Sequence, residues 1–231
     1  MRLGLERRPP MHRPAGLLAR AGAALVFYVA AACGASHIAD AAPKAQPDAA
    51  TTALLAEVRH TFRLNGKPIP PEIFRDFGDG DLADSGDIWV TVNVASAIGS
   101  NLYYDDITEG GGWVVQRHAA RKGEDAQETA YKYVGAADNG LLVAVATYNG
   151  GGSGYFTSLH ILDLAAQRAY DIDGKVYWQI NLTLIRTVPL GDRWDGEISI
   201  AKNAIRVVTT RSGPADDSGE RRTTTYEAKR P

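Results

Sequence analysis

From Asp87 onward the sequence consists of short runs rich in Val, Ile, Thr and Tyr, which turn residues interrupt about every ten positions. Such spacing predicts β-strands joined by tight turns. The runs are IWVTVNVA, GWVVQRH, ETAYKYVGA, LLVAVATY, YFTSLHILDL, RAYDI, EISIA, AIRVVTTR and RRTTTYEA. Asp138-Asn139-Gly140 and Lys202-Asn203 are the expected hairpin turns. The pattern predicts an all-β fold, either an antiparallel β-sandwich or a closed barrel.

Two of these runs also indicate where their strands lie in a sheet. Residues 141–146 are apolar on both alternating faces, which is typical of a central strand that is covered on each side. Residues 223–228 are mostly polar and lie near the end of the chain, so we expect an edge strand there. No repeat of fixed period is present, which argues against a propeller or a solenoid.

The part of the chain before Asp87 predicts one or two short helices. Pro71 suits the first turn of a helix that carries Ile73, Phe74 and Phe77 on one side. The segment around Leu54 and Val58 is compatible with either a helix or strands, because a turn signal at residues 63–66 follows it closely.

The N-terminal residues have the profile of a signal peptide. Residues 1–20 contain five Arg and precede an uncharged apolar stretch, AGAALVFYVAAA. That stretch is shorter than the roughly 20 residues a membrane-spanning helix needs. We therefore expect a signal peptide over residues 1–41, a flexible tether over 42–52 and a single β-rich domain over 53–231.

Two processing sites compete in this leader. Ala39-Asp40-Ala41 fits the small-x-small rule, so cleavage between Ala41 and Ala42 would release a soluble periplasmic or secreted protein. Cys33, the sole cysteine, follows three Ala at the end of the apolar stretch, where an outer-membrane lipoprotein would carry its lipid. The first route is the main expectation and lipidation of Cys33 is the alternative.

The charge of the expected mature chain argues against nucleic acid as a partner. From residue 42 onward there are 20 basic and 25 acidic side chains, a net charge of −5. No Lys/Arg run interleaved with aromatic residues offers a local exception to this repulsion of phosphates. The expected partner is an unidentified envelope ligand or protein, with membrane contact only through the alternative lipid anchor.

No cofactor, metal or catalytic residue is assigned from sequence motifs. The acidic segment 76–87, DFGDGDLADSGD, lacks the spacing of an EF-hand loop, so a solvated loop is favoured over a calcium site. His60, His118 and His160 have no zinc-ligand spacing. Strand alternation places His160 on the face of Ser158 and Leu162, which predicts a hydrogen-bonded interior histidine.

The candidate binding residues lie in a Gly-rich turn, NGGGSG, and in the polar-aromatic segment LGDRWDGE. Backbone amides of a Gly-rich turn can converge on an anion, and Trp194 could stack on a sugar ring or pack at the rim of the core. As a carbohydrate-directed hydrolase, the protein would instead use Asp195 and Glu197, or the Asp105-Asp106 pair. The candidate binding residues are Ser153, Tyr155, Asp192, Arg193 and Trp194.

Three blocks, FRLNGKPIPPEIF, NGGGSG and LGDRWDGE, resemble an uncharacterised family of exported proteins of the Gram-negative bacterial envelope. The resemblance spans most of residues 62–208. It implies export and a single domain, and it brings no activity, substrate or catalytic residue with it.

Together these features predict an exported envelope protein that acts as a non-catalytic ligand- or protein-binding accessory module. Loops on a rigid sheet often carry recognition, and both candidate segments lie between expected strands. The alternatives are the carbohydrate-directed hydrolase and a purely structural lipoprotein.

Overall fold

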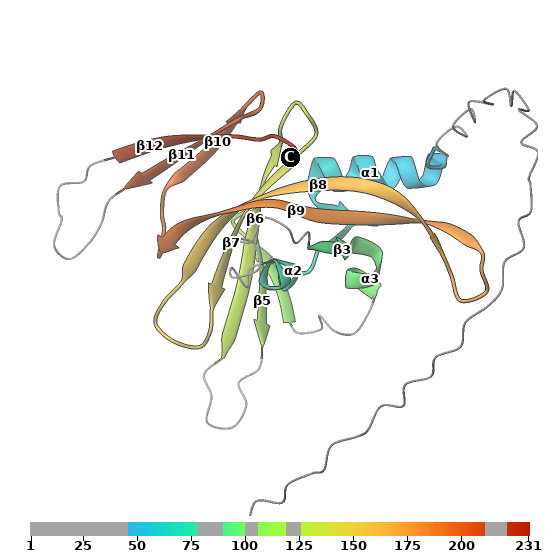
Figure 1. Cartoon of the computed structure of the whole chain (residues 1–231). Helices are drawn as coiled ribbons and strands as arrows, with labels where there is room; N and C mark the ends of the chain where they lie inside the picture. Colours follow the sequence, from blue (N-terminus) through green and yellow to red (C-terminus); the bar gives the residue numbers. More distant parts are fainter. Residues whose placement is uncertain (1–45, 78–89, 100–105, 119–125, 211–220) are drawn as a thin grey trace, which may run out of the picture. The chain divides into compact units, whose positions relative to one another are not determined.

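The strand-forming runs pair into a seven-stranded antiparallel sheet with the order β3-β9-β8-β7-β6-β5-β4 (Figure 1). The computed structural model describes residues 46–77, 90–99, 106–118, 126–210 and 221–231. The chain divides into two units, Met1–Lys44 and Ala45–Pro231, and every described element lies in the second. The strands of the large sheet are β3 (Thr91–Asn93), β4 (Asp106–Gly110), β5 (Trp113–His118), β6 (Gln127–Ala136), β7 (Leu142–Asn149), β8 (Phe156–Tyr170) and β9 (Val176–Asp192).

The prediction of a central strand covered on both sides is confirmed by β7. Leu142, Val143 and Ala144 are fully buried although their side chains alternate between the two faces of the sheet. The preceding turn is the predicted hairpin, in which Gly140 has a φ of 84° and donates its backbone N–H to the carbonyl of Ala137.

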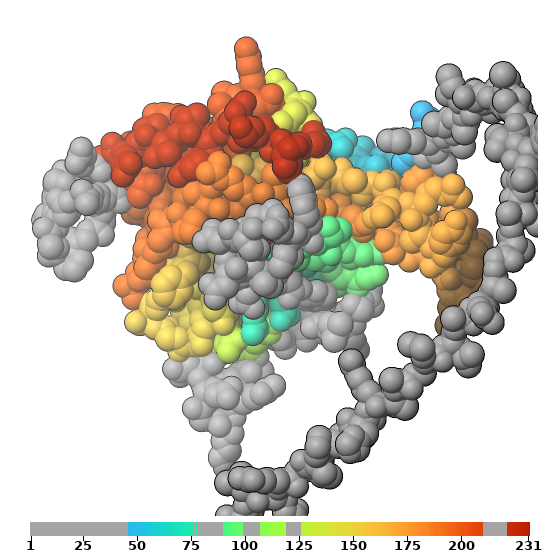
Figure 2. Space-filling model, viewed as in Figure 1, coloured from blue at the N-terminus to red at the C-terminus, as the bar shows by residue number. Residues whose placement is uncertain are grey.

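A second, three-stranded antiparallel sheet has the order β10-β11-β12. It consists of β10 (Glu197–Ala201), β11 (Ala204–Thr210) and β12 (Arg221–Glu227). The predicted turn at Lys202-Asn203 joins β10 to β11, and β12 is an edge strand, as the polar sequence 223–228 predicts. Figure 2 shows the orange and red residues of this small sheet as one continuous patch of surface.

The described residues form three helices: α1 (Ala49–Thr61) and α2 (Ile73–Asp76), which confirm the one or two short helices expected before Asp87, and α3 (Val94–Gly99), which follows Asp87 and was not predicted. They are accompanied by a two-stranded hairpin of β1 (Arg63–Leu64) and β2 (Lys67–Pro68). Helix α1 begins inside the predicted tether 42–52, because the Asp48 carboxylate caps it by accepting a hydrogen bond from the Thr51 N–H at 2.7 Å. None of the helices in the described ranges is long and apolar enough to cross a membrane.

Several predicted strand boundaries differ from those observed. IWVTVNVA contributes only β3, because Asn93 accepts a hydrogen bond from the Ser96 N–H and α3 begins at once. YFTSLHILDL and RAYDI form one continuous strand, β8. Strand β9 was not predicted, although it is the longest of the described strands and pairs with β8 along most of its length.

The large sheet is packed on both faces, which confirms the all-β sandwich. On one face α1, α2, α3 and the β1–β2 hairpin form a first core with Ala144 and Leu162. On the other face the small sheet forms a second core, in which Ile205 and Val207 pack with Val143 and Leu159. Strands β3 and β4 stand at opposite ends of the sheet order, so the described strands do not close into a barrel.

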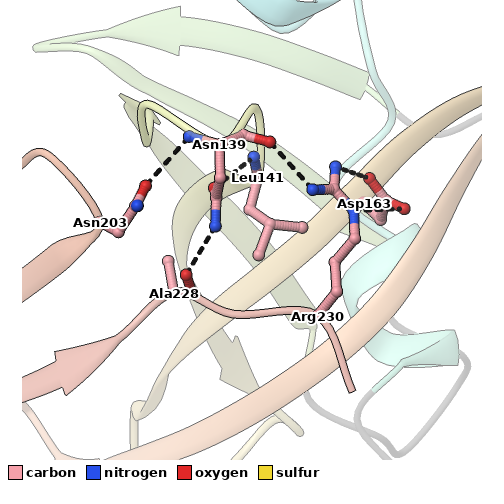
Figure 3. A network of polar contacts seen from close by, with 6 residues as sticks. All are labelled: Asn139, Leu141, Asp163, Asn203, Ala228 and Arg230. Carbon is pink, nitrogen blue, oxygen red and sulfur yellow. Dashed lines mark hydrogen bonds and ion pairs between the residues drawn. The ribbon is translucent and has the colours of Figure 1, made fainter.

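A network of polar contacts ties the small sheet and the C-terminal segment to the β6–β7 turn (Figure 3). Asn139 donates its side-chain N–H to the Ala228 carbonyl at 2.7 Å, and its backbone N–H to the side-chain oxygen of Asn203 at 3.0 Å. Arg230 donates to the carbonyl of Asn139 and forms an ion pair with Asp163 at 2.9 Å. This predicted turn therefore also fixes how the second sheet lies on the first.

Candidate functional site

The main candidate site is a pocket on the helix-covered face of the large sheet, where α2 lies over β6, β7, β8 and β9. It is open to solvent and has a volume of about 280 Å³. Its described lining consists mainly of aromatic and hydroxyl-bearing side chains, together with one cation and one histidine: Phe74, Arg75, Thr129, Ala146, Thr147, Tyr148, Phe156, Ser158, His160 and Thr187. Pockets of this composition, aromatic with a few placed polar groups, are typical of small-molecule sites.

The pocket exists because small side chains on the sheet face a very short helix. Helix α2 spans only Ile73–Asp76, and its Phe74 packs down onto the first core. In the strands opposite, Ala146 of β7 pairs with Ser158 of β8, so this cross-strand pair brings no large side chain into the space below α2. A space that larger side chains would close is therefore left open.

His160 is a buried histidine at this pocket. It is 2% exposed, and its ring lies 5.2 Å from that of Phe74, measured between ring centres. Its Nδ1 is 3.4 Å from the hydroxyl oxygen of Thr187 on β9, which confirms the predicted interior, hydrogen-bonded histidine. Burial lowers the pKa of His160 to about 4. The imidazole is therefore neutral at neutral pH and offers the pocket a polar group without charge.

Thr129 of β6 supplies a second buried polar group. It is 1% exposed, and its hydroxyl has no hydrogen-bond partner among the residues that the structure describes. A buried hydroxyl that makes no hydrogen bond costs about 1–3 kcal/mol. Thr129 pairs across the sheet with Tyr148, which also lines the pocket. The pocket is thus bordered by a hydroxyl that no described residue uses as a hydrogen-bond partner.

Arg75 is the cation of the pocket. Its guanidinium carbon lies 5.8 Å from the centre of the Tyr148 ring, within the range of a cation–π contact. Its Nη1 is 3.8 Å from a carboxylate oxygen of Glu72, and the Arg75 side chain is 46% exposed. Such a long ion pair at a partly exposed position is weak, so Arg75 keeps the ability to bind an anion.

Glu72 belongs to a small polar group beside the pocket. Its backbone N–H donates to the side-chain oxygen of Gln116 at 3.1 Å, and the Gln116 amide donates back to the Glu72 carboxylate at 3.5 Å. The Nε2 of His118 lies 4.0 Å from the same carboxylate. These contacts hold Glu72 against β5, so its carboxylate interacts with Gln116 and His118 as well as with Arg75.

The structure brings four of the five predicted binding residues together, at the end of the β8–β9 pair. The backbone N–H of Tyr155 donates to the Asp192 carboxylate at 2.7 Å, and the N–H of Arg193 donates to the Tyr155 carbonyl at 2.8 Å. The Arg193 guanidinium also donates to the Ser153 carbonyl. These contacts close the Gly-rich turn directly before Phe156, so the predicted cluster positions a residue that lines the pocket.

Trp194 lies apart from the other four residues and packs against the second core. Its indole N–H donates to the Thr209 hydroxyl at 3.3 Å. A Cβ at Gly196 would lie 1.9 Å from the carbonyl oxygen of Val208 and 2.6 Å from the indole ring. Only glycine fits at position 196. Trp194 therefore packs at the rim of the core, which is one of the two roles expected for it.

The structure describes the side chains of only one carboxylate pair of the hydrolase alternative, Asp195 and Glu197. Asp195 and Glu197 border a wider hollow between β6 and β10, and both are exposed to solvent. Glu197 forms an ion pair with Arg221 at 3.2 Å. Asp105 lies outside the described residues, and only the backbone of Asp106 is described.

No group of three or more potential metal ligands occurs among the described residues. His118 on β5 and His160 on β8 are separated by two strands in the sheet order, and His60 is exposed on α1. Most of the acidic segment 76–87 falls outside the described ranges, as do the cleavage site at Ala41 and Ala42 and the alternative lipid site at Cys33.

Arg75, Thr129, Ser158 and Phe156 were not predicted as site residues, and His160 was predicted only as an interior residue. A signal for part of the set was present in YFTSLHILDL. Phe156, Ser158, His160 and Leu162 share one strand face, so two polar residues lie on a face that is otherwise apolar. Arg75 had no such signal, because its place at the pocket depends on how α2 docks.

Comparison of the chain with protein-family models, with curated proteins and with solved structures finds no match.

Proposed function

We propose that this protein is a non-catalytic binding module of the bacterial envelope that holds a small molecule in the pocket below α2. The proposal is carried by one observation: buried polar side chains, Thr129 and His160, border an open pocket of about 280 Å³ instead of an apolar core. Replacing them with apolar residues would remove a desolvation cost, so their presence favours a ligand that uses them.

The composition of the pocket supports binding over catalysis. The described lining offers hydroxyls, aromatic rings and an arginine, and it contains no carboxylate. Its one histidine, His160, is a weak general base, because burial lowers its pKa to about 4. The contacts of Asp192 and Arg193 with the Gly-rich turn hold the segment directly before Phe156, which lines the pocket. Export rests on the Arg-rich leader and its cleavage site at Ala41, with a lipid anchor on Cys33 as the alternative.

The test is a ligand-observed NMR screen of small ring-bearing acids, alcohols and amines against the purified chain. Ser158→Trp places an indole in the pocket, and Ser199→Trp makes the same change at an exposed position of β10. We expect hits with the wild type and with Ser199→Trp, and loss of those hits with Ser158→Trp.

Urea unfolding of both variants checks that each is folded before binding is compared. If Ser158→Trp does not fold, Thr187→Phe serves as the second blocking variant on the neighbouring strand β9. Hits that persist in a folded, blocked variant would contradict the proposed site, and a screen without hits would contradict the proposed function.

A further inference from the structure

We infer that the ligand of this pocket is a small monoanion, a carboxylate carried on a flat apolar ring. The inference rests on the proposed binding function and specifies its chemistry. It follows from three properties of the pocket as the described residues form it: the sign of its charge, a hydroxyl beside its cation that has no partner among these residues, and its size and aromatic walls.

The charge of the lining selects against cations. Arg75 is the only charged side chain among the described residues that line the pocket. A bound ammonium group would find no carboxylate there and would face a like charge, whereas an anion would gain charge-assisted hydrogen bonds from the guanidinium. Because the described lining supplies one cation and Glu72 lies close behind it, a ligand with a single negative charge is better matched than one with two.

The hydrogen-bonding groups next to Arg75 suit a carboxylate in particular. Arg75 lies over the ring of Tyr148, and Tyr148 pairs directly with Thr129 across the sheet. The Thr129 hydroxyl has no partner among the described residues and can donate a hydrogen bond. An ionised carboxylate is the matching group, because it accepts hydrogen bonds and cannot donate them. The planar guanidinium of Arg75 also matches the geometry of a carboxylate, which is planar as well.

The walls and size of the pocket indicate a single ring. Phe74, Tyr148 and Phe156 all line it, and Phe156 is 62% exposed although it is a large apolar side chain. Exposure of such a residue at a pocket is typical of a surface that a ligand covers. The volume of about 280 Å³ lies at the lower end of the range for ligand pockets, which limits the ligand to a small molecule.

The inference is tested with three probes that share one ring and differ only in the head group: benzoate, benzyl alcohol and benzylamine. Each is titrated into the wild-type chain at low salt while affinity is followed by NMR. We expect benzoate to bind most tightly, with a dissociation constant on the order of 1 mM for a ligand of this size. Its affinity should fall as salt screens the Arg75 charge.

Two matched arginine variants show whether the preference comes from Arg75. Arg75→Gln should weaken benzoate binding roughly tenfold and leave benzyl alcohol nearly unchanged. Arg186→Gln is the control, because Arg186 also lies over a tyrosine ring, Tyr226 at 5.4 Å, but at the second core. Urea unfolding confirms that both variants remain folded.

The outcomes separate the ligand class from the binding function. Equal or tighter binding of benzyl alcohol or benzylamine, abolished by Ser158→Trp, would overturn the anion inference and leave the binding function standing. The same holds if none of the three probes binds while other screened fragments do. If nothing binds in either experiment, the proposed function itself fails.

Discussion

The two faces of the large sheet are built from the same strands but packed in different ways. On the face below the small sheet, Leu159 and Val143 lie in an apolar core with Ile205. On the face below the helices, His160 and Thr129 are buried beside an open pocket. Leu159 and His160 are neighbours in β8, so one step along the chain separates a packing residue from a candidate binding residue.

This difference shows how one sheet can be both stable and functional. The small sheet supplies a continuous apolar layer, which is the main source of stability for that face. Helix α2 is too short to cover the opposite face completely, which leaves the pocket below Phe74. The first and second cores can therefore together offset the cost of buried polar groups at the pocket.

The largest effect is expected from truncating the apolar face. Leu159→Ala should lower the free energy of unfolding by about 2–5 kcal/mol, because Leu159 is fully buried and its loss leaves a cavity. The neighbouring change Ser158→Ala, on the pocket face, should alter it by less than about 1 kcal/mol. Urea unfolding measures both values. Equal losses would mean that Ser158 is a packing residue like Leu159.

The next largest effect is a pH dependence of the free energy of unfolding, which comes from His160 on the pocket face. The folded-state pKa of His160, about 4, lies below the value of about 6.5 in an unfolded chain. The unfolded state therefore binds the proton first as pH falls, and stability is lost between about pH 6.5 and pH 4, with no loss above that window. By pH 4.5 the loss amounts to about 2–3 kcal/mol.

His160→Gln should remove that part of the pH dependence, measured by urea unfolding at pH 7 and pH 4.5. His60→Gln is the control, because His60 is exposed on α1. If the wild type and His160→Gln lose the same free energy over this range, His160 is not a buried neutral histidine.

The smallest effect on the free energy of unfolding is expected from two substitutions that remove a hydroxyl from the pocket face or add one to the opposite face. Thr129→Val should raise the free energy of unfolding by about 1 kcal/mol, because the buried hydroxyl it removes makes no hydrogen bond with the described residues. Val143→Thr should lower it by about 1–3 kcal/mol, because the same hydroxyl would be placed in the apolar core. A loss of stability in Thr129→Val would indicate that the hydroxyl has a partner in the folded chain.

Much of the sheet could be predicted from the sequence because its signals are local. The runs that became β5, β6 and β7 alternate or are wholly apolar, and Asn139-Gly140 specifies its hairpin by backbone conformation alone. Strand β9 was missed, because its long run contains Pro189 and mixes polar with apolar residues. The start of α1 was missed because Asp48 acts as a cap only once the helix forms.

The pocket could not be predicted in the same way, because it depends on contacts between distant segments. Arg75 on α2 and Tyr148 on β7 meet only after the helix docks on the sheet. The predicted cluster of Ser153, Tyr155, Asp192 and Arg193 did come together, since both of its segments lie at strand ends that pair. Trp194 did not join it, because Gly196 allows the indole to pack on the opposite face.

A methyl NMR titration of the Ala- and Thr-labelled chain with benzoate tests whether the helix-covered face is the binding face. We expect the methyl signals of Ala146, Thr129 and Thr187 to shift and the signal of Ala137 in the second core to stay unchanged. Shifts confined to the second core, or no shifts at the pocket methyls when binding is detected, would contradict it.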